Sequence, residues 1–313
     1  MTLAFVFPGQ GSQSVGMLNA LAAEYPVVKE TFAEASGALG YDLWQVVEQG
    51  PEAKLNQTEV TQPAMLTAGV ATWRAWLAGN GPRPQFMAGH SLGEYSALVC
   101  AEALEFHDAV KLVADRGRFM QEAVPVGQGS IAAILGLDAA AVRKLCEQAA
   151  QGEVLDAVNF NSPNQVVIAG TAAAVARAIE QSKAAGAKRA VLLPMSVPAH
   201  SRLMHAAAER MAERIKSVDV RPPRVPVIHN VHVRTEANTQ AIKDALVRQI
   251  ESPVRWVETI QKMVAEGVDR LVECGPGKVL TSLNKRIVKT AETLPVFDPA
   301  TLRETLALLA PVS

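Results

Sequence analysis

A serine lies at the centre of the pattern Gly-x-Ser-x-Gly in residues 89–93, which read GHSLG. Residues 86–90 predict a short strand, and a helix is expected from Ser91 onward. Between a strand and a helix, small glycines permit a sharp turn that lifts a serine hydroxyl above the sheet. The same serine at a helix N-cap would have a purely structural role. We favour a nucleophile because the strand and the helix are both predicted.

A serine that attacks a carbonyl needs hydrogen-bond donors for the oxyanion that develops. The backbone N–H of Leu92, at the start of the predicted helix, can be one donor. The loop at residues 9–11 (GQG), after the first predicted strand, can supply the N–H of Gln10 as the second. Alone, this loop would be an ordinary strand-to-helix turn, because it lacks the glycine spacing of the phosphate-binding motifs.

A serine hydroxyl is a weak nucleophile at neutral pH and needs an adjacent base. Six histidines compete for this role, and a single histidine is more often structural than catalytic. His90 adjoins the serine and is expected to point away from it, whereas His200 lies where the chain should re-enter its larger domain. From that hinge His200 can reach over the site. The other candidates are His107, His205, His229 and His232.

The elements that must position these residues alternate between strands and helices. Strands are expected at 3–7, 86–90, 225–228 and 270–274, and helices at 15–24, 26–38, 60–78, 107–123, 202–217, 239–250 and 254–266. This alternation predicts a parallel sheet with helices on both faces. We therefore expect a large α/β domain, similar to the α/β-hydrolases, formed by residues 1–127 and 198–313.

A second domain is predicted for residues 128–197. The expected order is strand, helix, strand, strand, helix, strand, at 130–135, 138–150, 154–160, 165–170, 172–185 and 189–193. This order is typical of a ferredoxin-like unit. We expect it to be inserted into the large domain, with hinges at 127–129 and 194–198.

Composition excludes several classes of protein. The 313 residues include 30 basic and 31 acidic side chains, a net charge of −1, which is not the pattern of a nucleic-acid-binding protein. No apolar run approaches membrane-spanning length, and the apolar start meets Pro8 too early for a signal peptide. The cysteines Cys100, Cys146 and Cys274 are odd in number and far apart, so neither a disulfide framework nor a zinc cluster is expected. We expect a soluble cytoplasmic protein that binds neither nucleic acid nor membrane.

From end to end the chain resembles the bacterial malonyl-CoA:acyl carrier protein transacylases. Four family motifs are present: FPGQGSQ at 7–13, GHSLGE at 89–94, RG-x-x-M at 116–120 and VP-x-H at 197–200. The resemblance implies that Ser91 accepts the acyl group, that His200 is the general base, and that the amides of Gln10 and Leu92 bind the oxyanion. It also implies that Arg116 and Met120 contact the substrate, and that the backbone carbonyl of Gln249 orients His200 in place of a triad carboxylate.

The physical chemistry of arginine agrees with the role implied for Arg116. Malonyl differs from acetyl by a carboxylate, which a planar guanidinium can bind with two charge-assisted hydrogen bonds. The alternative is a surface arginine paired with Asp115 or Glu122. The apolar neighbours Val113 and Phe119 favour a buried helix, in which an unpaired arginine would be strongly destabilising without a ligand.

The resemblance implies a ping-pong transfer that supplies fatty acid biosynthesis. The partners would be malonyl-CoA and acyl carrier protein, the enzyme would be a monomer, and neither a metal nor a cofactor would be needed beyond the coenzyme A thioester as substrate. A thioesterase that delivers water is the alternative enzyme. A non-catalytic carrier-docking module is the alternative outside enzymes.

Acyl carrier proteins are acidic, as the resemblance implies, so a nearly neutral transacylase needs a local basic patch to dock one. The best candidates share one predicted helix after the turn at 275–277: Lys278, Lys285, Arg286 and Lys289. Helical spacing would bring several of them onto one face. A solvated helix face with no partner explains the same residues equally well. Lys188 and Arg189 in the small domain are the next candidates.

Overall fold

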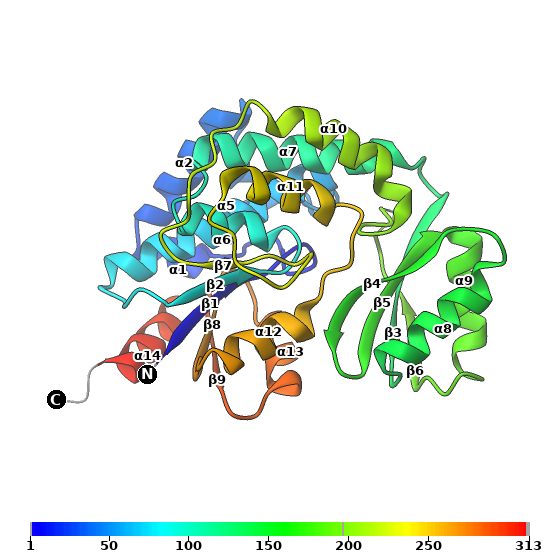
Figure 1. The fold of residues 1–313 in the computed structure, drawn as a ribbon. Coiled ribbons are helices and arrows are strands. Elements are labelled where there is room, and N and C mark those ends of the chain that lie inside the picture. Colours follow the sequence, from blue (N-terminus) through cyan, green and yellow to red (C-terminus); the bar gives the residue numbers. More distant parts are fainter. Residues whose placement is uncertain (1, 196, 311–313) are drawn as a thin grey trace.

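The structure is a computed structural model that describes residues 2–195 and 197–310. Its larger sheet is parallel throughout and has the order β7-β2-β1-β8-β9. The strands are β1 (Leu3–Phe7), β2 (Phe86–Gly89), β7 (Val227–Ile228), β8 (Arg270–Cys274) and β9 (Glu292–Val296). β1 lies in the middle of this sheet, so the loop after it and the turn after β2 leave neighbouring strands at the same edge (Figure 1).

Helices cover both faces of this sheet, and the central strand shows how the sequence specifies them. All five residues of β1 are buried. Leu3, Phe5 and Phe7 belong to the larger core cluster, with side chains of α5 (Thr58–Ala78), α6 (Gly93–Cys100) and α7 (Phe106–Ala123). Ala4 and Val6 face the opposite way, into a smaller cluster with α12 (Trp256–Ala265) and α13 (Val279–Ile287). Alternate side chains of one strand therefore build two cores, as burial on both faces requires.

Seven further helices of the described chain belong to the part of the molecule that contains the parallel sheet (Figure 1). They are α1 (Asn19–Glu24), α2 (Val27–Leu39), α3 (Leu43–Gln49), α4 (Glu52–Leu55), α10 (His205–Ile215), α11 (Thr239–Gln249) and α14 (Pro299–Leu309). α2 packs on α5 and α7, α10 packs on α7 and α11, and α14 packs on the edge strand β9.

Several predicted bounds were wrong. The helix expected from Ser91 begins at Gly93, because Ser91 itself has a left-handed backbone with φ of 52°. The helix expected at 202–217 begins at His205 after a short 3-10 turn and ends at Ile215. α13 ends at Ile287, so Lys289 lies beyond the helix on which it was predicted, and Lys278 is its N-cap.

The second sheet is antiparallel, with the order β4-β5-β3-β6. It contains β3 (Gly129–Leu135), β4 (Leu155–Ser162), β5 (Gln165–Thr171) and β6 (Arg189–Leu192), and the two helices α8 (Ala139–Ala150) and α9 (Ala172–Ser182) cover one face. The predicted order of elements is therefore confirmed. The division of the chain at residues 127 and 198 stays a prediction, with which these strand positions are compatible.

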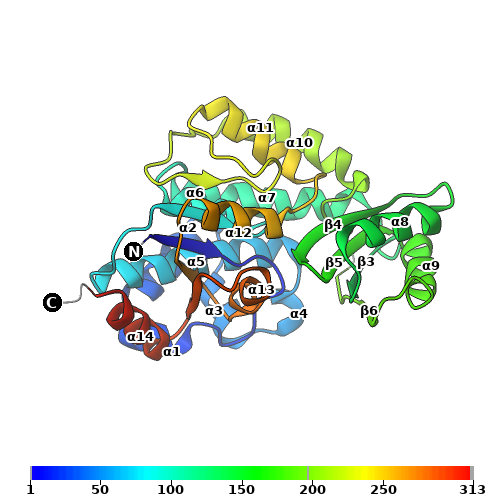
Figure 2. The same ribbon diagram turned by 60° about the horizontal axis from the view of Figure 1, so that its bottom comes forward.

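The small antiparallel lobe lies to one side of the parallel sheet (Figures 1 and 2). Backbone hydrogen bonds join it to the segment after α11, since Phe160 N donates to Val254 O (3.0 Å) and Val254 N donates to Val158 O (2.8 Å). Arg202 adds a side-chain link, because its Nε donates to Asp156 Oδ1 (3.0 Å). The segment at 249–254 thus connects the two sheets.

Among the described residues, no helix is both long enough and apolar enough to cross a membrane.

Candidate active site

Ser91 sits on a strained turn between β2 and α6. Its φ of 52° is unusual for a residue with a side chain. The flanking glycines are required by close packing: a Cβ on Gly89 would lie 1.8 Å from the carbonyl carbon of Gly93, and one on Gly93 would lie 2.0 Å from Phe7 O. The Gly-x-Ser-x-Gly spacing therefore has a steric cause in this fold, and the geometry is that of a nucleophile elbow.

His200 is the histidine that the structure brings to Ser91. Its Nε2 lies 2.7 Å from Ser91 Oγ, and its Nδ1 lies 2.7 Å from the backbone O of Gln249. A carbonyl oxygen only accepts hydrogen bonds, so Nδ1 carries the proton and Nε2 of the neutral ring accepts the Ser91 hydroxyl. The backbone N of His200 donates to Ile250 O (3.0 Å), which ties the imidazole and its carbonyl partner to the same segment.

The electrostatic surroundings keep His200 neutral. The residue is 3% exposed. Burial, and after it the nearby Arg116 cation, lowers the pKa of His200 to about 3. The imidazole is therefore unprotonated at neutral pH and free to take a proton.

The loop at 9–11 lies directly against the elbow. A Cβ on Gly9 would lie 2.5 Å from His90 O and 3.7 Å from the Leu92 nitrogen. In the described part of the chain, neither the Gln10 amide nor the Leu92 amide donates a backbone–backbone hydrogen bond. Two backbone donors thus remain beside Ser91, as an oxyanion hole requires.

Arg116 is almost fully buried on α7, with 1% of its surface exposed. Its Nη1 donates to Gln62 Oε1 (2.8 Å) and its Nη2 to Gln249 Oε1 (2.9 Å), and the same Nη2 lies 3.5 Å from Ser91 Oγ. The guanidinium also lies over the ring of Tyr95, with 5.4 Å to the ring centroid. Both of these hydrogen bonds are accepted by neutral amide oxygens, and in the part of the chain that the structure describes no carboxylate forms a hydrogen bond with the guanidinium.

The acidic neighbours of Arg116 on the helix have other partners. Asp115 accepts hydrogen bonds from Arg118 (2.8 Å) and Arg214 (2.6 Å), and Glu122 accepts one from Arg210 (2.6 Å). The alternative of a surface ion pair for Arg116 is therefore wrong.

Met120 lies one turn beyond Arg116 on the same buried helix, with its Sδ 3.6 Å from Gln62 Nε2. Gln62, on α5, was not predicted from the sequence. The sequence gives only a weak signal for it, a glutamine next to Pro63 in a helix that carries several other polar side chains.

A buried polar group behind the elbow was also missed. Glu94 is 0% exposed, and its Oε1 lies 2.7 Å from His229 Nδ1. Its Oε2 accepts hydrogen bonds from Asn230 N and from Gln249 Nε2, both at 2.9 Å. The Asn230 side chain in turn accepts from Ser91 N (2.8 Å) and donates to Gly89 O (2.7 Å). The signal was a charged residue, Glu94, in the first turn of a helix that had to be buried.

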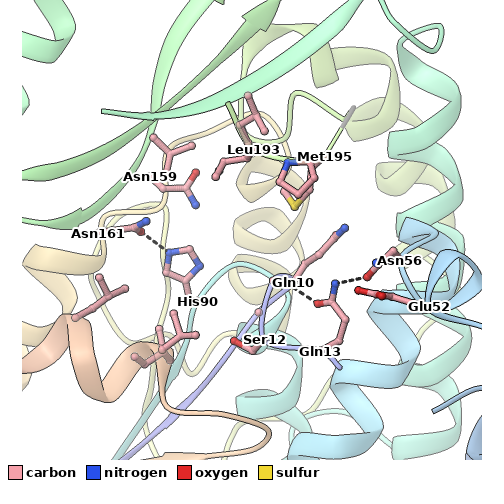
Figure 3. Close-up of a pocket in the computed structure, with 18 residues that line it drawn as sticks. Gln10, Ser12, Gln13, Glu52, Asn56, His90, Asn159, Asn161, Leu193 and Met195 are labelled. Atoms are coloured by element: carbon pink, nitrogen blue, oxygen red, sulfur yellow. Dashed lines mark hydrogen bonds between the residues drawn. The ribbon is translucent and has the colours of Figure 1, made fainter. Parts of the chain in front are cut away.

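A cavity of about 460 Å³ opens between the two sheets beside Gln10 and His90 (Figure 3). His90 forms part of its wall, and His90 Nε2 lies 2.8 Å from Asn161 Oδ1 on the small sheet. His90 thus pairs with Asn161 and not with Ser91. The other lining residues come from the loop at 9–13, from α4, from α13 and from the small sheet: Glu52, Asn56, Ile131, Asn159, Val167, Leu193, Pro194, Met195, Val279, Leu280 and Leu283.

The three cysteines are free and buried. Among the residues that the structure describes, no group of three or more His, Cys, Asp or Glu side chains is placed to hold a metal ion.

Comparison with known proteins identifies the family. The model of the acyl transferase domain matches residues 4–302. The malonyl CoA-acyl carrier protein transacylase of Escherichia coli (strain K12) is 57% identical over 305 residues, which cover 97% of this chain and 99% of that protein. This chain belongs to the malonyl-CoA:acyl carrier protein transacylase family. The resemblance found in the sequence is thereby confirmed.

Solved transacylase structures have the same fold. The enzyme from Coxiella burnetii superposes with a TM-score of 0.97 at 50% identity and covers 99% of this chain and 98% of its own. A malonyl-transacylase solved in complex with its type II PKS acyl-carrier protein superposes with a TM-score of 0.97 at 52% identity, covering 98% and 100%. The predicted fold class is confirmed for this member of the family.

Proposed function

We propose that this transacylase moves a malonyl group from coenzyme A to the phosphopantetheine thiol of acyl carrier protein, through a malonyl-Ser91 intermediate. The reaction supplies fatty acid biosynthesis. The observation that carries the proposal is the 2.7 Å contact between Ser91 Oγ and His200 Nε2 next to the buried cation of Arg116. A nucleophile, a base and an anchor for a carboxylate meet within one site.

In the first half-reaction, Ser91 Oγ attacks the thioester carbonyl while its proton passes to His200 Nε2. The tetrahedral oxyanion accepts hydrogen bonds from the Gln10 and Leu92 amides, a type of contact worth about 10²–10³ in rate per donor. The carbon–sulfur bond then breaks, and the coenzyme A thiolate takes the proton back from His200. The products are malonyl-Ser91 and free coenzyme A.

The second half-reaction runs the same steps in reverse with a different thiol. The carrier thiol gives its proton to His200 and attacks the Ser91 ester, and the same two amides hold the oxyanion. When the ester bond breaks, Ser91 Oγ recovers the proton from His200. The backbone carbonyl of Gln249 keeps the imidazole in the tautomer that both half-reactions need.

Arg116 would bind the carboxylate of the malonyl group. Its Nη2 is 3.5 Å from the attacking oxygen, a separation that suits an acyl group only three carbons long. Gln62 and Gln249 hold the guanidinium in place. Met120 would pack against the acyl chain one helical turn away.

The cavity between the two sheets would receive the pantetheine arm of either thiol, because it opens beside Gln10 and His90. Lys285 and Arg286 in the last turn of α13 are exposed near its rim, where Leu280 and Leu283 of the same helix line the wall. We assign carrier docking to this pair. We expect the enzyme to act as a monomer in the cytoplasm and to need no metal or redox cofactor.

Intact-mass measurement after brief exposure to malonyl-CoA tests the proposal. We expect one malonyl group on the peptide that contains Ser91, released rapidly by holo acyl carrier protein and slowly by water. Release to water at the same rate as to the carrier would identify a thioesterase. A chain that never becomes acylated would contradict the proposal.

A further inference from the structure

Glu94 is a fully buried carboxylate only three residues after Ser91, yet the reaction described above does not use it. It lies in the first turn of α6 and is not one of the residues that line the cavity. Burial of a carboxylate is strongly destabilising unless donors satisfy it. Its partners are His229, Asn230 and Gln249, and the last of these also contacts Arg116.

The Gln249 carboxamide connects Glu94 to Arg116. Its Nε2 donates both to Glu94 Oε2 (2.9 Å) and to Ser91 O (3.0 Å). These two partners can only accept when Glu94 is ionised, so the NH₂ group must face them. The opposite end of the amide, Oε1, is thereby turned toward Arg116 Nη2 at 2.9 Å. Reversal of the amide would set its NH₂ group against a guanidinium that can only donate.

This arrangement leaves the Arg116 cation ordered but not neutralised. The oxygens that accept its two shorter hydrogen bonds belong to Gln62 and Gln249, and Glu94 is separated from it by the length of one amide. A carboxylate in direct contact would compete with the carboxylate of the substrate. A carboxylate one residue removed holds the amide while leaving the guanidinium available.

We propose that Glu94 is a positioning residue that sets acyl selectivity: it holds the Gln249 carboxamide with its oxygen toward Arg116 and so aims the guanidinium at the carboxylate of the malonyl group. The inference rests on the role proposed for Arg116. It assigns to the Gln249 side chain a task separate from that of its backbone carbonyl, which orients His200.

Glu94 has a second contact, and the experiment must separate its effect from that of the contact with Gln249. It accepts a hydrogen bond from the backbone amide of Asn230, whose side chain forms hydrogen bonds with Ser91 N and Gly89 O. Loss of the contact with Asn230 would displace Ser91 and slow the transfer of every acyl group alike. Loss of the contact with Gln249 would slow the transfer only of acyl groups that have a carboxylate for Arg116 to bind. The ratio of the malonyl transfer rate to the acetyl transfer rate therefore distinguishes the effects of the two contacts.

The test compares the rates of Ser91 acylation by malonyl-CoA and by acetyl-CoA. Glu94→Ala is expected to lower the malonyl-to-acetyl ratio by roughly tenfold, the size expected for one hydrogen bond to a charged group. Glu94→Gln should restore most of the ratio, because its oxygen can still accept from Gln249 and its NH₂ can face His229 Nδ1 in the other tautomer. An unchanged ratio in Glu94→Ala would overturn the proposal.

Two matched variants separate this effect from general damage. Asn230→Ala keeps the backbone amide that Glu94 binds but removes the side chain that holds the elbow, so both rates should fall and the ratio should persist. Glu273 is another buried carboxylate, bound by the amides of Leu280 (3.0 Å) and Thr281 (2.6 Å). Glu273→Ala should lower thermal stability without changing the ratio. A ratio that falls equally in Glu273→Ala would overturn the proposal.

A double-mutant cycle tests the proposed route through Gln249. Gln249→Leu keeps the backbone carbonyl but removes the carboxamide, and should lower the ratio by itself. Adding Glu94→Ala should then lower it no further, because the two changes interrupt one contact. Additive losses would show that Glu94 acts by another route and would overturn the proposal. If Glu94→Ala does not fold, Glu94→Asp, which withdraws the carboxylate by one carbon, replaces it in the cycle.

Arg116→Ala distinguishes failure of this inference from failure of the proposed role of Arg116. If Arg116→Ala lowers malonyl and acetyl transfer equally, the role of Arg116 fails and this inference fails with it. If Arg116→Ala is selective and Glu94→Ala is not, only the inference about Glu94 fails.

Discussion

His200 Nδ1 donates its hydrogen bond to the backbone carbonyl of Gln249 at 2.7 Å, in the position that a carboxylate occupies in a Ser-His-Asp triad. A neutral carbonyl fixes the tautomer of the ring but stabilises its protonated form less than an ionised partner would. The Arg116 cation opposes protonation further. The result is an imidazole that stays neutral well below the ordinary pKa of histidine.

Acid stability should reveal this shift. The pKa of His200 is lowered from 6.5 to about 3, so between these values the unfolded chain binds a proton that the native chain excludes. Stability from this group is therefore fully present above about pH 6.5 and is lost as the pH falls toward 3. Between pH 7 and pH 5 the loss should reach about 2 kcal/mol.

Urea unfolding at pH 7 and at pH 5 measures this loss. His200→Gln should lose less stability than the wild-type chain over the same interval, because glutamine does not titrate. The comparison isolates His200 from His90 and His232, whose pKa values burial also lowers. Equal losses in the two proteins would show that His200 titrates normally.

Replacement of Ser91, the proposed nucleophile, gives the most direct test of the site. Ser91→Ala should abolish both transfer and covalent labelling by malonyl-CoA, because Ser91 is the one proposed acceptor. His200→Ala should slow both half-reactions by about 10²–10⁴, since the same imidazole acts as base and acid. The control is His90→Ala, which removes a contact with Asn161 in the cavity wall and should be the milder change. Acylation of another residue in Ser91→Ala would contradict the mechanism.

The sequence predicted those parts of the site that local pattern determines. The elbow follows from the glycine spacing around Ser91 and from a strand before it. Burial of Arg116 follows from the apolar residues around it on α7. By contrast, Gln62, Asn230 and the environment of Glu94 depend on partners far along the chain: Asn230 and Ser91, for example, are 139 positions apart. No periodicity within one element records such a pairing.

The fold, like the site, was predictable where a local sequence pattern determines the element. Buried strands such as β1 and the alternating elements of the small lobe have strong local patterns. The edge strand β9 was missed, and Pro295 within it weakens the strand signal. α14 was also missed although its start is explicit, with Asp298 and Thr301 forming a capping box around Pro299.

Arg116→Ala should change acyl selectivity. Removal of a buried charge-assisted contact is expected to raise the transition-state free energy of malonyl transfer by about 2–3 kcal/mol. Acetyl transfer should be spared or improved, since acetyl has no carboxylate to bind. The measurement is kcat/KM for malonyl-CoA and for acetyl-CoA with the same carrier. Equal losses for the two substrates would assign Arg116 a structural role.

The last prediction concerns the surface that meets the acyl carrier protein. Lys285 and Arg286 are exposed in the last turn of α13, the helix whose Val279, Leu280 and Leu283 line the cavity beside the site. A carrier that inserts its arm into this cavity must bring its acidic surface close to that helix. Lys289 lies past the end of the helix, and its Nζ donates to Lys285 O, so its charge adjoins the same patch. Within α13 itself, the residues that we expect to matter are Lys285 and Arg286.

Charge reversal at both positions should raise KM for the carrier and weaken its dependence on salt, because rim charges act mainly through long-range attraction. The rate at which malonyl-CoA acylates Ser91 should stay nearly constant, since that step does not involve the carrier. Arg286 Nη1 also donates to Gln165 Oε1 (3.2 Å) on the small sheet, so Lys285→Glu alone separates docking from that contact. The matched control is Lys188→Glu with Arg189→Glu, an exposed pair on the small sheet. Carrier kinetics that respond to the control pair and not to Lys285 and Arg286, across a range of ionic strength, would move the docking surface to the small lobe.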